Sequence, residues 1–269
     1  MIPKIIHMCW LSGDDFPEVI LKCIDSWRIH LSDYEIWLWG RCPKGFNSKD
    51  VSAFKIIKEV SFDVNSIPWT KQAYNTGKYA FAADYIRLYA LYNYGGIYLD
   101  SDVLMYKSFN SLLNYPYFIG LDHLEGFEPA IIGAEQGTRW LGEILERYKD
   151  LPFVNRDGSY NTQTLPCVFY DMLNGKYKFK KASDKVSYSN DPNIIYIFNR
   201  YCFNSRDAFG AIKTSQSYCS HNYAASWLDD GKKEKGGTVL PRRLYNFIWR
   251  LYHFFLFRNK YSINLKNND

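Results

Sequence analysis

Two aspartates stand one residue apart in the stretch GGIYLDSDVLMY, residues 95–106, directly after a short apolar run. Two like charges this close repel each other unless a cation lies between them, and carboxylate oxygens are preferred ligands of Mg²⁺ and Mn²⁺. We read residues 97–106 as one strand, on which Asp100 and Asp102 point to the same side because side chains two residues apart share a face. The sequence therefore predicts a divalent-metal site at the carboxyl end of a strand, where open α/β sheets bind their ligands. A surface pair without a ligand is the alternative, since two aspartates alone are a weak signal.

A second charged pair lies on the helix expected to feed this strand. Residues 77–96 end in two glycines, which stop a helix, and they carry an apolar stripe at helical spacing: Phe81, Tyr85, Leu88 and Tyr92. Asp84 and Arg87 are three residues apart and share a neighbouring face. An ordinary intrahelical ion pair is one interpretation. The functional interpretation is an acid that accepts sugar hydroxyls beside an arginine that binds a phosphate or sugar oxygen.

Hydrophobic periodicity divides the chain into strands and helices. Strands are predicted at residues 4–11, 34–39, 97–106, 117–123, 185–189 and 193–198. Helices are predicted at residues 17–31, 48–60, 77–96, 138–151 and 165–175. The first 40 residues form a strand–helix–strand unit, which favours a parallel sheet covered by helices. The expected fold class is therefore α/β.

Composition sets limits on the molecule. A chain of 269 residues with 47% hydrophobic content fits one domain, or one domain with a small appendage. Its six cysteines have no paired spacing, which predicts buried thiols in a reducing compartment and not a disulfide framework. The N-terminal apolar run is too short for the core of a signal peptide, and no uninterrupted apolar segment reaches the length of a membrane span. We therefore expect a cytoplasmic protein without a membrane-spanning helix.

The positive charge is concentrated near the C-terminal end. From Lys232 onward nine Lys or Arg residues face two acidic ones, although the net charge of the whole chain is +5. The main body is therefore not expected to bind nucleic acid. On a helix beginning at Pro241, one face is apolar and aromatic and the opposite face is basic, which is typical of a helix lying on an anionic membrane surface. Packing of that helix against the body is the alternative.

Three stretches together resemble a known family. IPKIIHMCWLSG, FAADYIRLYALYNYGGIYLDSD and HNYAASW are similar to segments of the DxD-motif sugar transferases of the glycosyltransferase family 32 type. That family includes outer-chain mannosyltransferases, capsular polysaccharide transferases and the catalytic domains of large glucosylating toxins. The resemblance implies a GT-A-like nucleotide-binding sheet, mostly parallel and Rossmann-like, flanked by helices. It also divides the chain into a catalytic domain, residues 1–228, and a basic linker with an amphipathic C-terminal helix, residues 229–269.

The resemblance also implies roles for individual residues. The residues matching catalytic positions are Asp84, Arg87, Asp100 and Asp102. The residues matching donor-binding positions are Cys9, Trp10, Asp84, Arg87, Asp100, Ser226 and Trp227, with Trp10 stacking on the base of the nucleotide. The metal, Mn²⁺ or Mg²⁺, is expected on Asp102 and Asp100, with either His221 or Asn222 completing the shell. Asn222 departs from the histidine that is usual in this segment, and the choice between the two stays open.

The function implied is transfer of a sugar, with retention of configuration, from a nucleotide-sugar donor, a UDP-sugar being favoured. The expected acceptor is a saccharide or lipid-linked saccharide in cell-surface or capsular polysaccharide synthesis, and the expected location is peripheral, on the inner face of the cell membrane. Two alternatives are a sugar-nucleotide pyrophosphorylase and a non-catalytic carbohydrate- or metal-binding module. The first is disfavoured because residues 10–18, WLSGDDFPE, are acidic where a pyrophosphorylase has a basic, glycine-rich loop.

Overall fold

The computed structural model describes residues 1–43, 57–183, 186–207, 210–222, 260–263 and 265. Its helices are α1 (Glu18–His30), α2 (Pro68–Asn75), α3 (Tyr79–Tyr94), α4 (Arg139–Tyr148), α5 (Leu165–Leu173) and α6 (Arg200–Phe203), with one 3₁₀ turn at Asn110–Leu112. The strands are β1 (Ile5–Trp10), β2 (Glu35–Gly40), β3 (Ile57–Val60), β4 (Gly96–Leu99), β5 (Val103–Met105), β6 (Tyr117–Leu121), β7 (Phe127–Ala134), β8 (Lys178–Lys181), β9 (Ile194–Ile197), β10 (Arg206–Asp207), β11 (Gly210–Ala211) and β12 (Cys219–His221).

The central sheet has six strands in the order β3-β2-β1-β4-β7-β6. Strands β3, β2, β1 and β4 run parallel, and β7 runs antiparallel to both β4 and β6. The βαβ unit predicted from the first 40 residues is β1-α1-β2, in register from Ile5 opposite Glu35 to Trp10 opposite Gly40. The expected α/β class with a mostly parallel sheet is confirmed.

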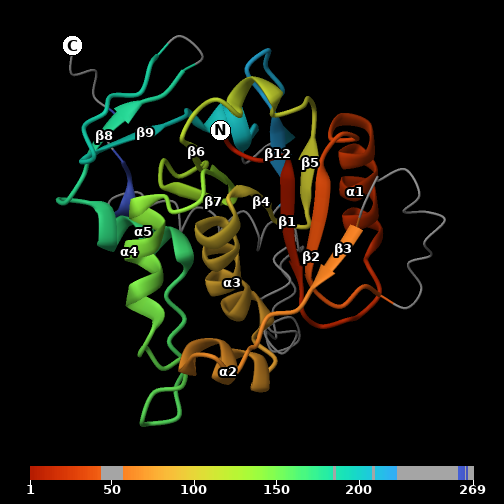
Figure 1. The fold of residues 1–269 in the computed structure, drawn as a ribbon, viewed down its shortest axis with the longest axis vertical. Helices are drawn as coiled ribbons and strands as arrows, with labels where there is room; N and C mark the ends of the chain where they lie inside the picture. The colour runs from red at the N-terminus through yellow and green to blue at the C-terminus, as the bar shows by residue number, and fades with distance from the viewer. Residues whose placement is uncertain (44–56, 184–185, 208–209, 223–259, 264, 266–269) are drawn as a thin grey trace, which may run out of the picture.

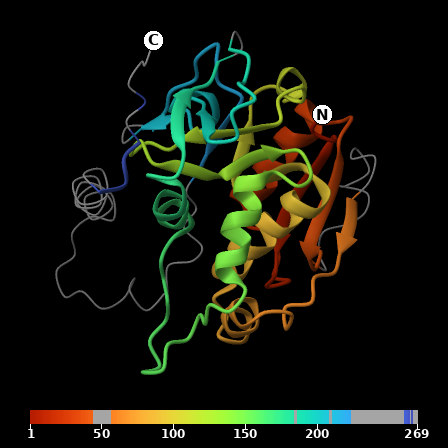
Figure 2. The same cartoon turned by 60° about the vertical axis from the view of Figure 1, so that its left-hand side comes forward.

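Helices cover both faces of this sheet, as alternate side chains of its strands require (Figures 1 and 2). In β2, Ile36 and Leu38 join one buried cluster, whereas Trp39 joins the other. The first cluster includes residues of α1, β5 and α6, and the second includes residues of α2, α3, α4 and α5. Figure 1 shows α1 on one side of β1 and β2, and α3, α4 and α5 on the other.

Two predicted elements are wrong. The helix expected at residues 48–60 ends instead in the strand β3, which extends the parallel sheet beside β2; residues 48–56 lie outside the described part. The strand expected at residues 185–189 is absent at 186–189, where Tyr188 packs by stacking its ring on Tyr196, with 4.4 Å between centroids. In both places tertiary packing overrides a local pattern.

The remaining sequence expectations have mixed outcomes. All six cysteines are free thiols, and Cys23, Cys167, Cys202 and Cys219 are buried. Within the described residues, no helix combines the length and apolar character needed to cross a membrane. The linker and most of the amphipathic helix predicted at residues 229–269 lie outside the described part, so those predictions stand as predictions.

His7 is a buried side chain of β1 whose role is structural. Trp39 Nε1 donates to His7 Nδ1 at 3.1 Å, and His7 Nε2 lies 2.7 Å from the carbonyl oxygen of Gly95. Because an indole N–H only donates, Nδ1 must be the acceptor and Nε2–H the donor, which defines a neutral imidazole. Burial lowers the pKa of His7 to about 4, and the hydrogen bond to Gly95 opposes this only in part.

This histidine predicts a loss of stability in weak acid. The unfolded state takes up the proton near pH 6.5, well above the pKa of about 4 in the folded state, so the contribution of His7 to the free energy of unfolding falls as the pH drops below neutral. His7 alone should lower it by about 2 kcal/mol between pH 8 and pH 5. Urea unfolding of the wild type and of His7→Gln, whose amide donates and accepts but does not titrate, measures the effect. Equal pH dependence in both proteins would contradict the assignment.

Candidate active site

The two aspartates lie on a turn and not on one strand, which corrects the prediction for residues 97–106. The chain leaves the central sheet after β4 and enters β5, which pairs with β12 in a separate two-stranded sheet. The Asp100 N–H donates to the Ala130 carbonyl at 2.9 Å, and the Val103 N–H donates to the Asp100 carbonyl at 3.1 Å. The predicted location at the carboxyl end of a strand is correct, but a tight turn gathers the carboxylates, and strand alternation does not.

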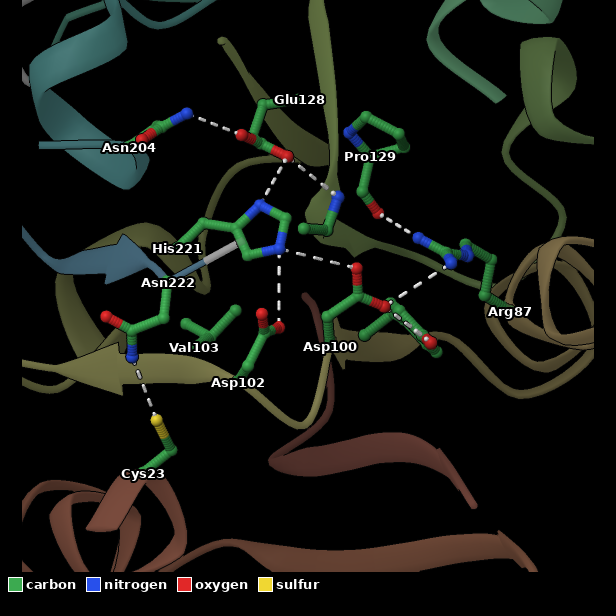
Figure 3. A network of polar contacts seen from close by, with 12 residues as sticks. Cys23, Arg87, Asp100, Asp102, Val103, Glu128, Pro129, Asn204, His221 and Asn222 are labelled. Carbon is green, nitrogen blue, oxygen red and sulfur yellow. Dashed lines mark hydrogen bonds and ion pairs between the residues drawn. The ribbon is translucent and has the colours of Figure 1, made fainter. Parts of the chain in front are cut away.

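His221 reaches the aspartates through the pairing of β12 with β5. This antiparallel pair sets His221 opposite Val103, next to Asp102, and the Asn222 N–H donates to the Asp102 carbonyl at 3.1 Å. His221 Nε2 lies 3.3 Å from Asp102 Oδ1 and 3.9 Å from Asp100 Oδ2. One ligand atom from each of the three side chains lies within 4.8 Å of the others (Figure 3).

Arg87 binds the aspartates from the α3 side. Its Nη2 lies 3.1 Å from Asp84 Oδ1 and 3.3 Å from Asp100 Oδ1. Its Nη1 donates to the Pro129 carbonyl at 2.9 Å, and its guanidinium lies over the ring of Tyr98, 4.5 Å from the centroid. The intrahelical pair considered as the simpler interpretation is therefore present, but Asp84 and Arg87 are only 9% and 7% exposed, and Arg87 also binds Asp100.

An irregularity in β7 forms the wall of the site opposite α3. Ile119 of β6 pairs with Ile132, but Gly120 pairs with Glu128, so residues 129–131 are extra on β7. A bulge of this kind redirects the chain, and proline is tolerated there because no ladder hydrogen bond is lost. The bulge supplies the carbonyls of Pro129 and Ala130 to Arg87 and Asp100, and it turns Glu128 toward His221, with 3.4 Å between Oε1 and Nδ1.

The groups of this site include more acidic than basic side chains, which favours binding of a cation. Burial raises the pKa of Asp84 to about 7, and it also raises the pKa of Asp100 against the pull of Arg87 and His221. Burial lowers the pKa of His221, but the carboxylates of Asp102 and Glu128 outweigh it and hold the pKa well above its usual value. Among the described residues of this cluster, four carboxyl groups therefore meet two cationic side chains, Arg87 and His221.

The donor set fits a divalent ion. Two carboxylates and one imidazole with their ligand atoms close together suit Mn²⁺, and the carboxylates suit Mg²⁺. An ion at this point would offset the excess of carboxylates and take the position of the proton on His221 Nε2. The residues that would hold it are Asp100, Asp102 and His221.

Cys9 and Trp10 lie at the end of β1. His7 pairs with Tyr98 in parallel register, so Cys9 lies level with Asp100. Burial raises the pKa of Cys9 to about 12, with Arg87 and Tyr98 as its polar neighbours. Trp10 is partly buried, donates its indole N–H to the Asp14 carbonyl at 2.7 Å, and contacts Phe16 edge to face.

The C-terminal candidates divide into described and undescribed residues. His221 faces the aspartates, whereas the Asn222 side chain turns its Nδ2 toward Cys23 Sγ at 3.2 Å (Figure 3). Of the two residues left open as metal ligands, His221 is the one whose side chain lies between Asp100 and Asp102. Ser226 and Trp227 lie outside the described residues, and their roles remain predictions.

Sequence reasoning missed three polar groups of the site. Tyr98 donates its hydroxyl to Asp100 Oδ1 at 2.9 Å, and Asn204 Nδ2 donates to Glu128 Oε2 at 2.7 Å. Glu128 is itself 2% exposed. A single glutamate within the apolar run GFEPAIIGA was the available signal, because a charge in such a run must find partners when the run is buried.

Part of this chain is similar to a known protein family. Residues 17–119 match the family described as "Glycosyltransferase sugar-binding region containing DXD motif". This range contains Asp84, Arg87, Asp100 and Asp102, and it confirms the resemblance to the DxD sugar transferases. The match covers 103 of the 269 residues, so the similarity is to the DXD-containing region alone.

Several curated fungal proteins are similar to this chain. Inositol phosphoceramide mannosyltransferase 3 of Schizosaccharomyces pombe is 31% identical over 157 residues, which are 56% of this chain and 38% of that protein. Inositol phosphoceramide mannosyltransferase 2 of the same organism is 27% identical over 75% of this chain and 62% of its own length. A mannosyl phosphorylinositol ceramide synthase of Saccharomyces cerevisiae is 32% identical over 44% of this chain and 27% of its own length. The chain thus spans less than two thirds of each of these relatives.

Solved structures of glycosyltransferases also overlap with it. The PaToxG glycosyltransferase is 25% identical with a TM-score of 0.46, over 64% of this chain and 68% of that one. The apo form of GlyE from Streptococcus pneumoniae is 11% identical with a TM-score of 0.46, over 96% of this chain and 62% of that one.

Proposed function

We propose that this protein is a divalent-metal-dependent glycosyltransferase that moves a hexose from a nucleotide-sugar donor to a hydroxyl acceptor. The observation that carries the proposal is the convergence of Asp100, Asp102 and His221 at the carboxyl edge of the parallel sheet. The match of residues 17–119 to a DXD sugar transferase region supports it independently. Neither a pyrophosphorylase nor a non-catalytic module accounts for both observations.

The chain's own residues prepare the site for a diphosphate. When bound, Mn²⁺ or Mg²⁺ supplies Lewis-acid stabilisation of the negative charge that develops on the leaving diphosphate. Arg87 fixes Asp100 and Asp84 in place, and Tyr98 fixes Asp100 from the other side. Because these contacts are buried, the carboxylates do not have to reorganise when the donor binds, which is the condition for electrostatic catalysis.

The donor and acceptor proposed follow from the relatives and the sequence. Relatives named as inositol phosphoceramide mannosyltransferases support a lipid headgroup or lipid-linked saccharide as acceptor, and they give no support to a capsular one. The names of these relatives also indicate that nucleotide-linked mannose should be among the donors tested. A UDP-sugar is the donor that we propose from the family resemblance, with GDP-sugars as the comparison.

Retention of configuration is proposed through attack on the same face as the leaving group. The resemblance implies retention, and no carboxylate in the sequence is required to act as a nucleophile. Mass spectrometry of the enzyme incubated with donor alone tests this route. A glycosyl adduct on an Asp or Glu side chain would contradict it.

Isothermal titration with UDP and with GDP, in Mn²⁺ and then in EDTA, tests the function. The transferase predicts that Mn²⁺ tightens binding of one diphosphate by at least about tenfold, equivalent to 1.4 kcal/mol. The same protein should slowly hydrolyse the matching sugar nucleotide to free sugar and diphosphate. Release of sugar 1-phosphate with added pyrophosphate would indicate a pyrophosphorylase, and binding of sugar without nucleotide would indicate a carbohydrate-binding module.

We also propose that the protein works at the cytoplasmic face of a membrane through the basic amphipathic segment beginning at Pro241. That segment lies outside the described residues, so the support is its sequence alone. Sedimentation with liposomes of anionic and of neutral lipid at low salt tests it. Equal recovery with both kinds of liposome would contradict the proposal.

A further inference from the structure

Glu128 is a buried acid directly behind the site, and the proposed function gives it no task. It is 2% exposed and lies at the start of the β7 bulge, opposite Gly120. An ionised carboxylate at this depth is costly unless its oxygens are hydrogen-bonded or paired with a positive group. The partners of Glu128 therefore indicate what it is for.

Each oxygen of this carboxylate has a defined direction. Asn204 Nδ2 donates to Oε2 at 2.7 Å, and the Ala130 N–H donates to Oε1 at 3.2 Å. Oε1 also faces His221 Nδ1 at 3.4 Å (Figure 3). With Oε2 bound to Asn204, the side chain cannot rotate without breaking a buried hydrogen bond. Glu128 therefore presents one fixed acceptor oxygen to His221.

This contact determines which nitrogen of His221 is available to a metal. If a metal took the place of the proton on Nε2, the carboxylate facing Nδ1 would keep the hydrogen there, and the lone pair of the neutral imidazole would be on Nε2. Nε2 is the nitrogen that lies between the aspartates, 3.3 Å from Asp102 and 3.9 Å from Asp100. Carboxylates that orient metal-binding histidines in this way increase metal affinity, and their loss typically costs about 10- to 100-fold.

We propose that Glu128 is a positioning residue for the divalent ion, acting through the ring of His221. This inference rests on the proposed function, because it takes Asp100, Asp102 and His221 as the metal site. It also explains the β7 bulge, because the extra residues bring Glu128 to Nδ1 of His221, on the side of the ring away from the aspartates. A purely structural role, in which Glu128 serves only to pair with Asn204, is the competing explanation.

A double-mutant cycle on Mn²⁺ affinity separates the two explanations. Free Mn²⁺ is measured by electron paramagnetic resonance for the wild type, Glu128→Gln, His221→Ala and the double variant. Glu128→Gln should weaken Mn²⁺ binding by about 10- to 100-fold. In the His221→Ala background the same change should add nothing, because Glu128 acts only through that ring. A loss that is equal in both backgrounds would overturn the proposal.

A spectroscopic measurement reports on the histidine itself. Mn²⁺ bound to the wild type should show electron spin echo modulation from one imidazole nitrogen, and His221→Ala should lack it. Glu128→Gln should weaken this modulation, which a structural role confined to Asn204 would leave unchanged. Glu143→Gln makes the same chemical change on α4, where Glu143 pairs with Arg139 and Lys176, and it should match the wild type.

The outcomes also distinguish this inference from the proposed function. If the wild type shows no Mn²⁺ binding, the proposed function and this inference both fail. If the wild type binds Mn²⁺ with nitrogen modulation and Glu128→Gln is identical to it, only the inference about Glu128 fails. Should Glu128→Gln not fold, Asn204→Ala provides the second variant, because it releases Oε2 and should weaken Mn²⁺ binding in the same direction. Unchanged affinity in Asn204→Ala would then overturn the proposal.

Discussion

Asp102→Ala is expected to lower Mn²⁺-dependent hydrolysis of the donor by about 10³-fold, because a metal acting as a Lewis acid contributes several kcal/mol to the transition state. Asp102 is 7% exposed, and its carboxylate contacts His221 at 3.3 Å. Its loss removes one of the three groups whose ligand atoms converge. Initial rates of hydrolysis at saturating donor, over a range of Mn²⁺ concentrations, measure the effect.

The fold should survive this substitution. Removing one carboxylate from a cluster with an excess of acidic groups relieves repulsion, and the backbone contact from Asn222 to the Asp102 carbonyl is kept. Ser101→Ala lies in the same turn and is the matched control, with a rate close to that of the wild type. An Asp102→Ala protein that is folded and turns over the donor within tenfold of the wild-type rate would contradict the metal site.

Arg87→Met is expected to lower the free energy of unfolding by about 3–5 kcal/mol at pH 8, because it leaves buried carboxylates without their counter-charge. Arg87 neutralises Asp84 at 3.1 Å and Asp100 at 3.3 Å. Methionine retains most of the side-chain volume, so no large cavity forms. The decrease in unfolding free energy therefore measures the loss of the positive charge and of its hydrogen bonds. Urea unfolding in EDTA measures the change without a contribution from bound metal.

The loss of unfolding free energy caused by Arg87→Met should become smaller as the pH falls. Burial already raises the pKa of Asp84 to about 7 in the presence of Arg87, and without Arg87 the pKa rises further. From pH 8 toward pH 5, the folded variant therefore gains more stability from protonation of Asp84 than the wild type does, and the difference between the two proteins becomes smaller. Arg139→Met is the control: Arg139 is half exposed and pairs with Glu143 at 3.0 Å, and its loss should cost about 0–1 kcal/mol. Equal losses for Arg87 and Arg139 would contradict the burial argument.

The local parts of the site could be predicted from the sequence. Asp84, Arg87 and the aspartate pair lie within 19 residues of one another along the chain, and a helix that stops at two glycines before a strand must bring them together. The first βαβ unit was predictable for the same reason, since its hydrophobic periods are regular. Only the turn at Asp100–Asp102 was misread, because an apolar run that continues through residue 105 conceals the change from one sheet to another.

The distant parts of the site could not be predicted in this way. His221 reaches Asp102 through the pairing of β12 with β5, and no local pattern specifies which two short strands will pair. Strand β7 was missed because Glu128 and Pro129 interrupt its apolar run, yet the bulge that accommodates them builds one wall of the site. Helix α2 was not predicted because its eight residues hold barely two turns of hydrophobic periodicity.

In the proposed function, Asp100, Asp102 and His221 hold a divalent ion that binds the diphosphate of the donor. Crystals grown with MnCl₂ and UDP, and measured at the manganese absorption edge, test this most directly. We expect one strong anomalous peak between these three side chains, with both phosphates of the nucleotide in contact with it. A nucleotide bound without manganese at this position, or manganese bound elsewhere in the chain, would contradict it.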